Sequence, residues 1–138
     1  MNSEVMYRGI VYPWQCDHVG HMNIMWYVGK FDEANWNFLA QLGLTPSYVR
    51  ESGHVLAALQ QNISYKREMI AGDMVLIESR LIEIREKTVR FSHDMRNGET
   101  GETTAICEML AVHMERVARK SAPWPATVRQ LAEQHLAS

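Results

Sequence analysis

The feature that most constrains this chain is a long apolar helical pattern in its first third. From about Trp26 to Leu42, apolar side chains recur at spacings of three and four residues, so they share one face of a helix. They are Tyr27, Phe31, Ala34, Phe38 and Leu42. Gly43 follows directly, and glycine commonly ends a helix because it adopts the left-handed conformation without steric cost. A helix this apolar must be largely covered by other parts of the chain.

Most of the remaining sequence is typical of β-strands. A first strand is expected over residues 5–14, where β-branched and aromatic types are frequent, with Pro13 at its end. Thr45-Pro46 predicts the start of a short helix that runs to about Glu51. Four further strands, with turns at Gly72-Asp73 and Asn97-Gly98, and a C-terminal helix complete the pattern; the strands are expected over 55–67, 74–84, 88–95 and 103–116, and the helix over 126–136.

This order of elements predicts an α+β fold. A curved antiparallel sheet of about five strands should wrap around the one long helix, because no other element is apolar enough to cover it. The chain has no repeat and no interdomain linker, so its 138 residues are expected to form a single domain. Such a sheet leaves edge strands open, and pairing with a second copy would remove that liability, so we expect a homodimer.

Composition excludes several classes of partner. A net charge of -2 gives no argument for nucleic acid or membrane binding. No apolar run approaches the roughly 18 residues of a spanning helix, and the first residues lack a signal-peptide core. Cys16 and Cys107 make a poor disulfide framework at this length. Together these features favour a cytoplasmic protein.

The reactive side chains concentrate in the loop just before the long helix. It places Cys16, Asp17, His18, His21 and Asn23 around a glycine. Asp17 is compatible with a helix or turn cap and with a catalytic carboxylate, and composition alone leaves both open. The Asp-His-x-x-His pattern invites a metal site, but no distant Cys or His lies at a telling spacing, so we expect no metal. His18 is expected to be a solvated loop residue.

The other cysteines and histidines have structural interpretations. Cys16 and Cys107 are expected to pack rather than react, because neighbouring side chains in an extended segment point to opposite faces. His93 and His113 lie in alternating strand patterns, and we expect each to be partly buried with a hydrogen-bonding partner.

The chain resembles the hotdog-fold acyl-CoA thioesterases, in the branch that contains 4-hydroxybenzoyl-CoA thioesterase and the Tol-Pal-associated thioesterases. That branch has a loop of the form D-x-x-G-(H/I/V)-(V/M)-N before a tyrosine-containing helix with an acidic-Ala pair. The matching stretches are Asp17 to Asn23, Tyr27, and Phe31-Asp32-Glu33-Ala34. Ile63 to Arg67, followed by Gly72-Asp73, resembles the family's strand, tyrosine and turn. The resemblance covers about residues 7–118, so the C-terminal segment 124–136, which contains the expected helix, lies outside it.

Two departures concern the acyl pocket. Many relatives have a second asparagine after the glycine-containing run, where this chain has Ile24 after Asn23, and threonine is common where Cys16 stands. Trp14 and Trp26 flank the loop.

The resemblance implies a thioester hydrolase acting on acyl-CoA, without a cofactor. It implies that Asp17 is the nucleophile or the general base, with His21 as a catalytic helper. A thioester carbonyl also needs donors for the developing oxyanion, and backbone N–H groups at a helix start can supply them. Substrate contacts are expected from Asn23, Ile24, Trp26 and Tyr27. Weaker candidates for the phosphates of coenzyme A are Arg85, Lys87 and Arg90.

Two alternatives stay open at this stage. One is a hydratase or dehydratase of acyl thioesters on the same fold, with His21 and Asp17 as its acid and base. The other is a non-catalytic acyl-thioester binding protein in which Asp17 is a cap. The acyl group is not indicated: the tryptophans suit a flat pocket or a core, and aromatic side chains can also enclose a quaternary ammonium group, although no spacing points to one. A homodimer and a dimer of dimers are both compatible with the sequence.

Overall fold

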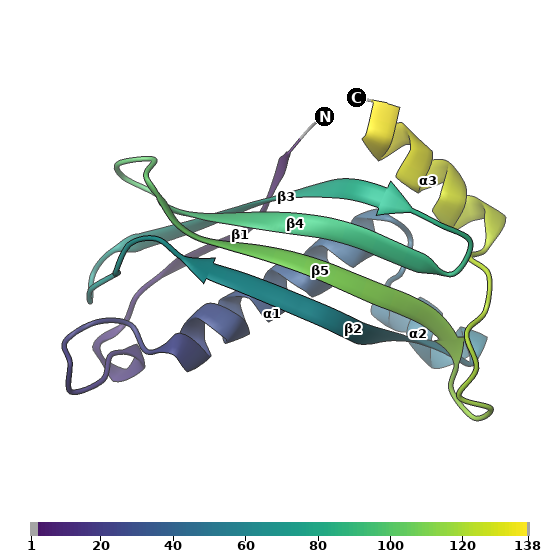
Figure 1. Ribbon diagram of the computed structural model, residues 1–138, viewed down its shortest axis with the longest axis horizontal. Helices are drawn as coiled ribbons and strands as arrows, with labels where there is room; N and C mark the ends of the chain where they lie inside the picture. Colours follow the sequence, from purple (N-terminus) through teal and green to yellow (C-terminus); the bar gives the residue numbers. More distant parts are fainter. Residues whose placement is uncertain (1–2, 138) are drawn as a thin grey trace.

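A computed structural model describes residues 3–137 of the chain (Figure 1). Five strands form one sheet in the order β1-β3-β4-β5-β2, and every neighbouring pair is antiparallel. The strands are β1 (Glu4–Ile10), β2 (His54–Tyr65), β3 (Met74–Ile84), β4 (Thr88–Asn97) and β5 (Thr103–Glu115). The helices are α1 (Ile24–Gln41), α2 (Pro46–Ser52) and α3 (Ala126–Ala137), with a 3-10 turn at Pro13–Gln15. The predicted α+β architecture is therefore confirmed.

Helix α1 lies across one face of the sheet (Figure 1). All five residues of its predicted apolar face are buried: Tyr27, Phe31, Ala34, Phe38 and Leu42. Phe38 packs on Phe91 of β4 with ring centroids 5.2 Å apart. The helix ends as predicted, because Gly43 takes a φ of 89°. This packing fixes the helix axis, and with it the position of the helix N-terminus at one end of the sheet.

Three expectations need correction. The first strand ends at Ile10 rather than at residue 14, because Pro13 lacks the N–H that a ladder needs and starts the 3-10 turn instead. Helix α1 begins at Ile24, two residues before Trp26, because Asn23 caps it. Lys30 does not belong to the predicted apolar face, which predicts that it points away from the core; instead it is buried, and its Nζ donates to the Tyr7 hydroxyl at 3.2 Å. Burial lowers the pKa of Lys30.

His93 ties the sheet to the helix through a buried hydrogen-bonded chain. Desolvation by burial lowers its pKa to about 4, so the ring is neutral at neutral pH. Its Nε2 lies 2.6 Å from Oδ1 of Asn35 on α1, and its Nδ1 lies 2.6 Å from Oγ of Ser79 on β3. Because the amide oxygen only accepts, Nε2 carries the proton and Nδ1 accepts from the serine hydroxyl. The expected structural role of this histidine is confirmed.

Candidate active site

The loop that precedes α1 is closed by its own backbone. Cys16 and Met22 form an isolated antiparallel bridge, and the Asp17 N–H donates to the His21 carbonyl at 3.1 Å. Gly20 sits at the tip with a φ of 96°, which a side chain would disfavour. The loop is thus a small fixed turn that presents Asp17 beside the start of the helix.

The Asp17 carboxylate accepts two hydrogen bonds. The Val19 N–H donates to Oδ1 at 2.9 Å, and the side-chain Nδ2 of Asn23 donates to Oδ2 at 2.9 Å. The Asn23 bond, followed by the Val19 bond, lowers the pKa of Asp17, because both favour its charged form. The carboxylate is therefore ionised at neutral pH. The bond from the Val19 N–H is the turn contact expected of a capping aspartate. The bond from the Asn23 side chain is an additional contact that a capping role alone does not predict.

Asn23 connects this carboxylate to the helix. Its side-chain Oδ1 accepts from the Met25 N–H at 2.9 Å, which makes Asn23 the N-cap of α1. Its carbonyl accepts from the Trp26 N–H at 2.9 Å. Among the described residues no acceptor is present for the N–H of Ile24, the first helical residue. This donor lies at the positive end of the helix dipole, where negative charge is stabilised.

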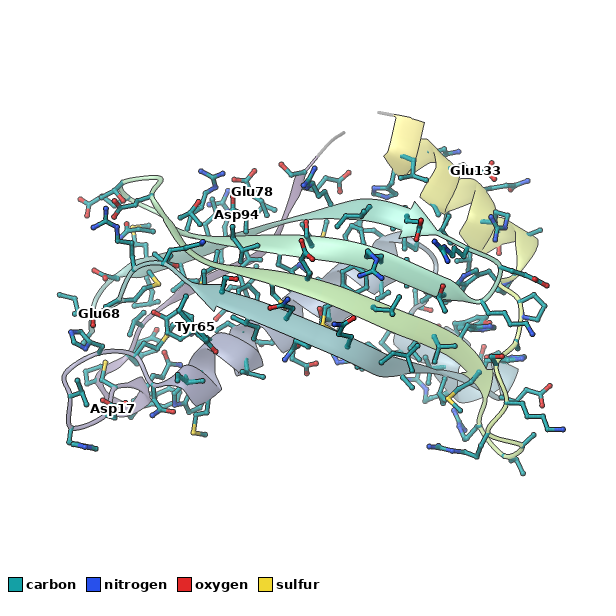
Figure 2. The ribbon with its side chains drawn as sticks, viewed as in Figure 1. Asp17, Tyr65, Glu68, Glu78, Asp94 and Glu133 are labelled. Atoms are coloured by element: carbon teal, nitrogen blue, oxygen red, sulfur yellow. The ribbon has the colours of Figure 1, made fainter. Side chains whose placement is uncertain are left out.

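These groups open onto a cavity of about 900 Å³. Four of the predicted site residues besides Asp17 line it, namely His21, Asn23, Ile24 and Tyr27. The other walls come from Val19, Met22, Tyr65, Lys66, Arg67, Glu68 and Glu102. Figure 2 shows Asp17, Tyr65 and Glu68 at the same end of the sheet, with Glu133 of α3 toward the other end.

The far wall of the cavity was not predicted as part of the site. Glu68 Oε2 lies 2.8 Å from His21 Nε2, and Arg67 pairs with Glu102 at 3.2 Å. Tyr65, the last residue of β2, meets Tyr27 edge-on with centroids 5.2 Å apart. The stretch Ile63 to Arg67 already matched the family pattern in the sequence, but only the register of β2 brings its end to the Asp17 loop.

Two groups of predicted substrate contacts lie elsewhere in the chain. Trp26 does not line the cavity; its ring packs edge-on against Trp14, with centroids 5.0 Å apart. Arg85 and Lys87 lie in the turn between β3 and β4, and Arg90 follows in β4, at the opposite end of the sheet from the Asp17 loop (Figure 1). Within one chain these three basic residues do not meet the site.

The remaining reactive residues add little to the cavity. His18 is exposed and Cys107 is buried in the core. Within residues 3–137 no three His, Cys, Asp or Glu side chains are grouped so that they could hold a metal ion. In the same part of the chain, no helix has both the length and the apolar character needed to cross a membrane.

Residues 11–131 match the model of a protein family that is described as the thioesterase-like superfamily. Betainyl-CoA thioesterase of Pseudomonas aeruginosa is 27% identical over 135 residues, which cover 95% of this chain and 85% of that protein. L-carnitine dehydrogenase/betainyl-CoA thioesterase of Agrobacterium fabrum is 30% identical over 109 residues. That match takes in 79% of this chain but only 22% of the much longer relative.

The fold has close counterparts among solved structures. A Staphylococcus aureus protein in complex with CoA superposes with a TM-score of 0.91 at 17% identity, over 99% of this chain and 87% of the other. At this identity the likeness concerns the fold alone. Together with the family match it confirms the predicted hotdog fold.

Proposed function

The chain belongs to the thioesterase-like superfamily, and on that premise we propose that it hydrolyses the thioester bond of an acyl-CoA to a carboxylic acid and coenzyme A. The observation that carries the proposal is the bridge made by Asn23. One side chain holds the Asp17 carboxylate at 2.9 Å and caps the helix whose first N–H, that of Ile24, has no acceptor among the described residues. A nucleophile or base and an oxyanion donor thus share one cavity.

In the proposed reaction, the carbonyl oxygen of the thioester accepts a hydrogen bond from the Ile24 N–H. In one route an Asp17 oxygen attacks the carbonyl carbon, the C–S bond breaks, the thiolate leaves, and water cleaves the resulting anhydride to restore the carboxylate. In the other, Asp17 takes a proton from the water that attacks the same carbon, and the leaving thiolate receives that proton. Both routes need ionised Asp17, which the bonds from Asn23 and Val19 favour. We assign the transfer of this proton to His21, whose Nε2 lies 2.8 Å from Glu68 Oε2.

The coenzyme A part of the substrate needs cationic partners. Lys66 and Arg67 line the cavity from the end of β2, and we assign phosphate contacts to them first. Arg85, Lys87 and Arg90 remain candidates only if a second subunit brings its own copies to this site. For the acyl part, betainyl-CoA is the first substrate to test, because two relatives carry that activity in their names.

We propose that the active form is a homodimer joined along β2. This strand lies at the edge of the sheet, is 12 residues long, and leaves Leu59 58% exposed. An open, partly apolar edge of this length invites pairing with another strand. An apolar groove beside it, between α1 and strands β2, β5 and β4, contains Leu39, Leu56 and Phe91. A second copy would cover both the strand edge and the groove, and a dimer of dimers would add a second interface.

The free thiols of Cys16 and Cys107 suit a cytoplasmic location.

The experiment that tests the function is thiol release from a panel of acyl-CoAs that includes betainyl-CoA and neutral aliphatic and aromatic thioesters. We expect Asp17→Asn to lower the rate by about 10²- to 10⁴-fold, the range for a catalytic acid or base. Asp94→Asn is the matched control, because Asp94 lies on β4, bonds Arg96 and Thr103, and does not line the cavity. Full activity in a folded Asp17→Asn protein would contradict the assignment. Hydration of an enoyl-CoA without thiol release would favour the hydratase alternative.

A further inference from the structure

Four consecutive residues, 65–68, line the candidate active site from the end of β2. In a regular strand successive side chains point to opposite faces, so only every second residue would reach one cavity. The backbone leaves this pattern directly after Tyr65, where β2 ends. The N–H groups of Lys66 and Arg67 both donate to the carbonyl of Thr104, at 2.8 and 3.1 Å. Two residues thus face one residue of β5, as in a β-bulge, and bulges next to active sites re-aim side chains.

The hydroxyl of Tyr27 holds the other side of this bulge. It donates to the Arg67 carbonyl at 3.2 Å, so the N–H of Arg67 is bonded to β5 and its carbonyl to α1. Burial raises the pKa of Tyr27, so the hydroxyl stays protonated and able to donate at neutral pH. Tyr27 is only 4% exposed, and the Tyr65 ring packs edge-on against it. These contacts fit a positioning role better than the direct substrate contact expected from the sequence.

The bulged segment is also fixed at its far end. Met69 is fully buried, and its carbonyl accepts from the Met22 N–H of the Asp17 loop at 2.7 Å. Between the two ends, and among the described residues, the Tyr27 hydroxyl is the one side-chain group that bonds the backbone of residues 66–68. Loss of that hydroxyl therefore frees the segment at its centre and leaves both ends attached.

The bulge presents the two cationic side chains of the cavity, Lys66 and Arg67. Arg67 pairs with Glu102 at 3.2 Å, and both side chains are more than half exposed. Exposed pairs of this kind contribute little to stability, so a phosphate group can take the place of the carboxylate. Two cations bind phosphate oxygens well only when their directions and separation match the anion, and here the bulge sets both.

We propose that Tyr27 is a positioning residue for the binding of coenzyme A. Its hydroxyl holds the bulge at Lys66 and Arg67, and the bulge directs both cations toward the phosphates. This inference rests on the proposed function, which assigns the phosphates to these two residues. It gives Tyr27 an effect on the binding of coenzyme A and none on the reacting carbonyl.

The test compares two tyrosine hydroxyls that are each engaged in a hydrogen bond. Tyr27→Phe removes one hydroxyl and keeps the ring. Tyr48→Phe is the matched control, because Tyr48 bonds His113 at 2.7 Å and does not line the cavity. We expect Tyr27→Phe to raise the Kd of coenzyme A, measured by titration calorimetry, about three- to tenfold, a part of what hydrogen bonds to charged groups contribute. Tyr48→Phe should leave this Kd unchanged.

A multiple variant tests whether Tyr27 acts through the two cations. In a protein that already carries Lys66→Gln and Arg67→Gln, adding Tyr27→Phe should change the Kd no further, because the side chains that it positions are gone. A further rise of the same size in that background would overturn the proposal.

Kinetics locate the effect on the substrate. With acyl-CoA, Tyr27→Phe should raise KM and leave kcat nearly unchanged. With acyl-pantetheine, which lacks the phosphates, it should change neither constant. An equal rise in KM for both substrates would overturn the proposal, since Tyr27 would then act on the part that they share.

Three other results would also overturn the positioning role: an unchanged Kd in Tyr27→Phe, an equal change in Tyr48→Phe, and no binding of coenzyme A to the unaltered protein. The calorimetry keeps this role distinguishable from the proposed function. If Tyr27→Phe weakens binding as expected and no acyl-CoA is hydrolysed, the proposed hydrolysis fails and the positioning role stands. If hydrolysis occurs and Tyr27→Phe changes neither Kd nor KM, the function stands and the positioning role fails.

Discussion

Asn23 donates a 2.9 Å hydrogen bond to the carboxylate of Asp17, and the oxygen of the same amide caps helix α1. The carboxylate and the helix start are therefore positioned by one side chain rather than by two independent contacts. Loss of the whole Asn23 amide therefore affects both the stability of the helix and the state of the carboxylate, and a pair of variants at residue 23 separates these two effects.

Asn23→Ala should remove both contacts. We expect a loss of about 1 kcal/mol in the free energy of unfolding, as for other N-caps. Because the Asn23 bond is the largest cause of the lowered pKa of Asp17, its loss raises that pKa, and the acid limb of the pH–rate profile moves to higher pH. Asn23→Ser is the control: serine still caps the helix but is too short to hold the carboxylate. It should recover stability without restoring the profile, and a profile unchanged in both variants would contradict the role of Asn23.

Lys66→Gln should weaken binding of coenzyme A. Lys66 lines the cavity, and a lost contact to phosphate should raise KM for acyl-CoA, with an effect that shrinks as salt is added. Acyl-pantetheine, which lacks the phosphates, should have the same KM with both proteins. The matched control is Lys120→Gln, because Lys120 follows β5 in the chain and does not line the cavity. Equal KM values for acyl-CoA in Lys66→Gln and the unaltered protein would remove Lys66 from the binding site.

Leu59→Lys should weaken the dimer. A lysine on an open edge strand disfavours pairing with another strand, and Leu59 is 58% exposed at the middle of β2. Light scattering should give twice the 15.9 kDa chain mass for the unaltered protein and a shift toward one chain for the variant. Val117→Lys is the control, because Val117 is 93% exposed in the turn after β5. A monomeric unaltered protein at micromolar concentration would rule out the β2 dimer.

Acidification should destabilise the fold through His93. Its pKa is lowered to about 4 in the folded state, against about 6.5 in the unfolded chain. The unfolded state therefore binds more protons between these values, and stability falls as the pH drops below 6.5. The expected loss between pH 7 and pH 5 is about 2 kcal/mol from this residue. Urea unfolding at both pH values measures it, with His93→Gln as the comparison. A His93→Gln protein with the same loss would show that other groups cause it.

The local elements of the fold could be predicted because their signals are local. The apolar face from Tyr27 to Leu42, the cap at Thr45 before Pro46, and the limits of β3 at Met74 and Ile84 all follow from spacing and from single-residue preferences. Asn97-Gly98 did mark a hairpin, but Asn97 caps a longer loop with its side chain, and Gly101 rather than Gly98 takes the positive φ.

The site was predicted in part for the same reason. Asp17, Asn23 and Ile24 are neighbours in sequence, so a single motif contained one wall of the cavity. Glu68 and Tyr65 are more than 40 residues away, and no periodicity connects them to the loop. The burial of Lys30 was missed because its partner, Tyr7, belongs to another element.

The sequence by itself determined which segments become helix or strand and which loop carries the carboxylate, because backbone preference and the period of apolar residues act within a few positions. Only the tertiary structure decided what faces that loop. The antiparallel register of β2 on β5 brings Tyr65 to the end of the sheet where α1 begins. Such register depends on the summed packing of two whole strands, and no single stretch of sequence contains that information.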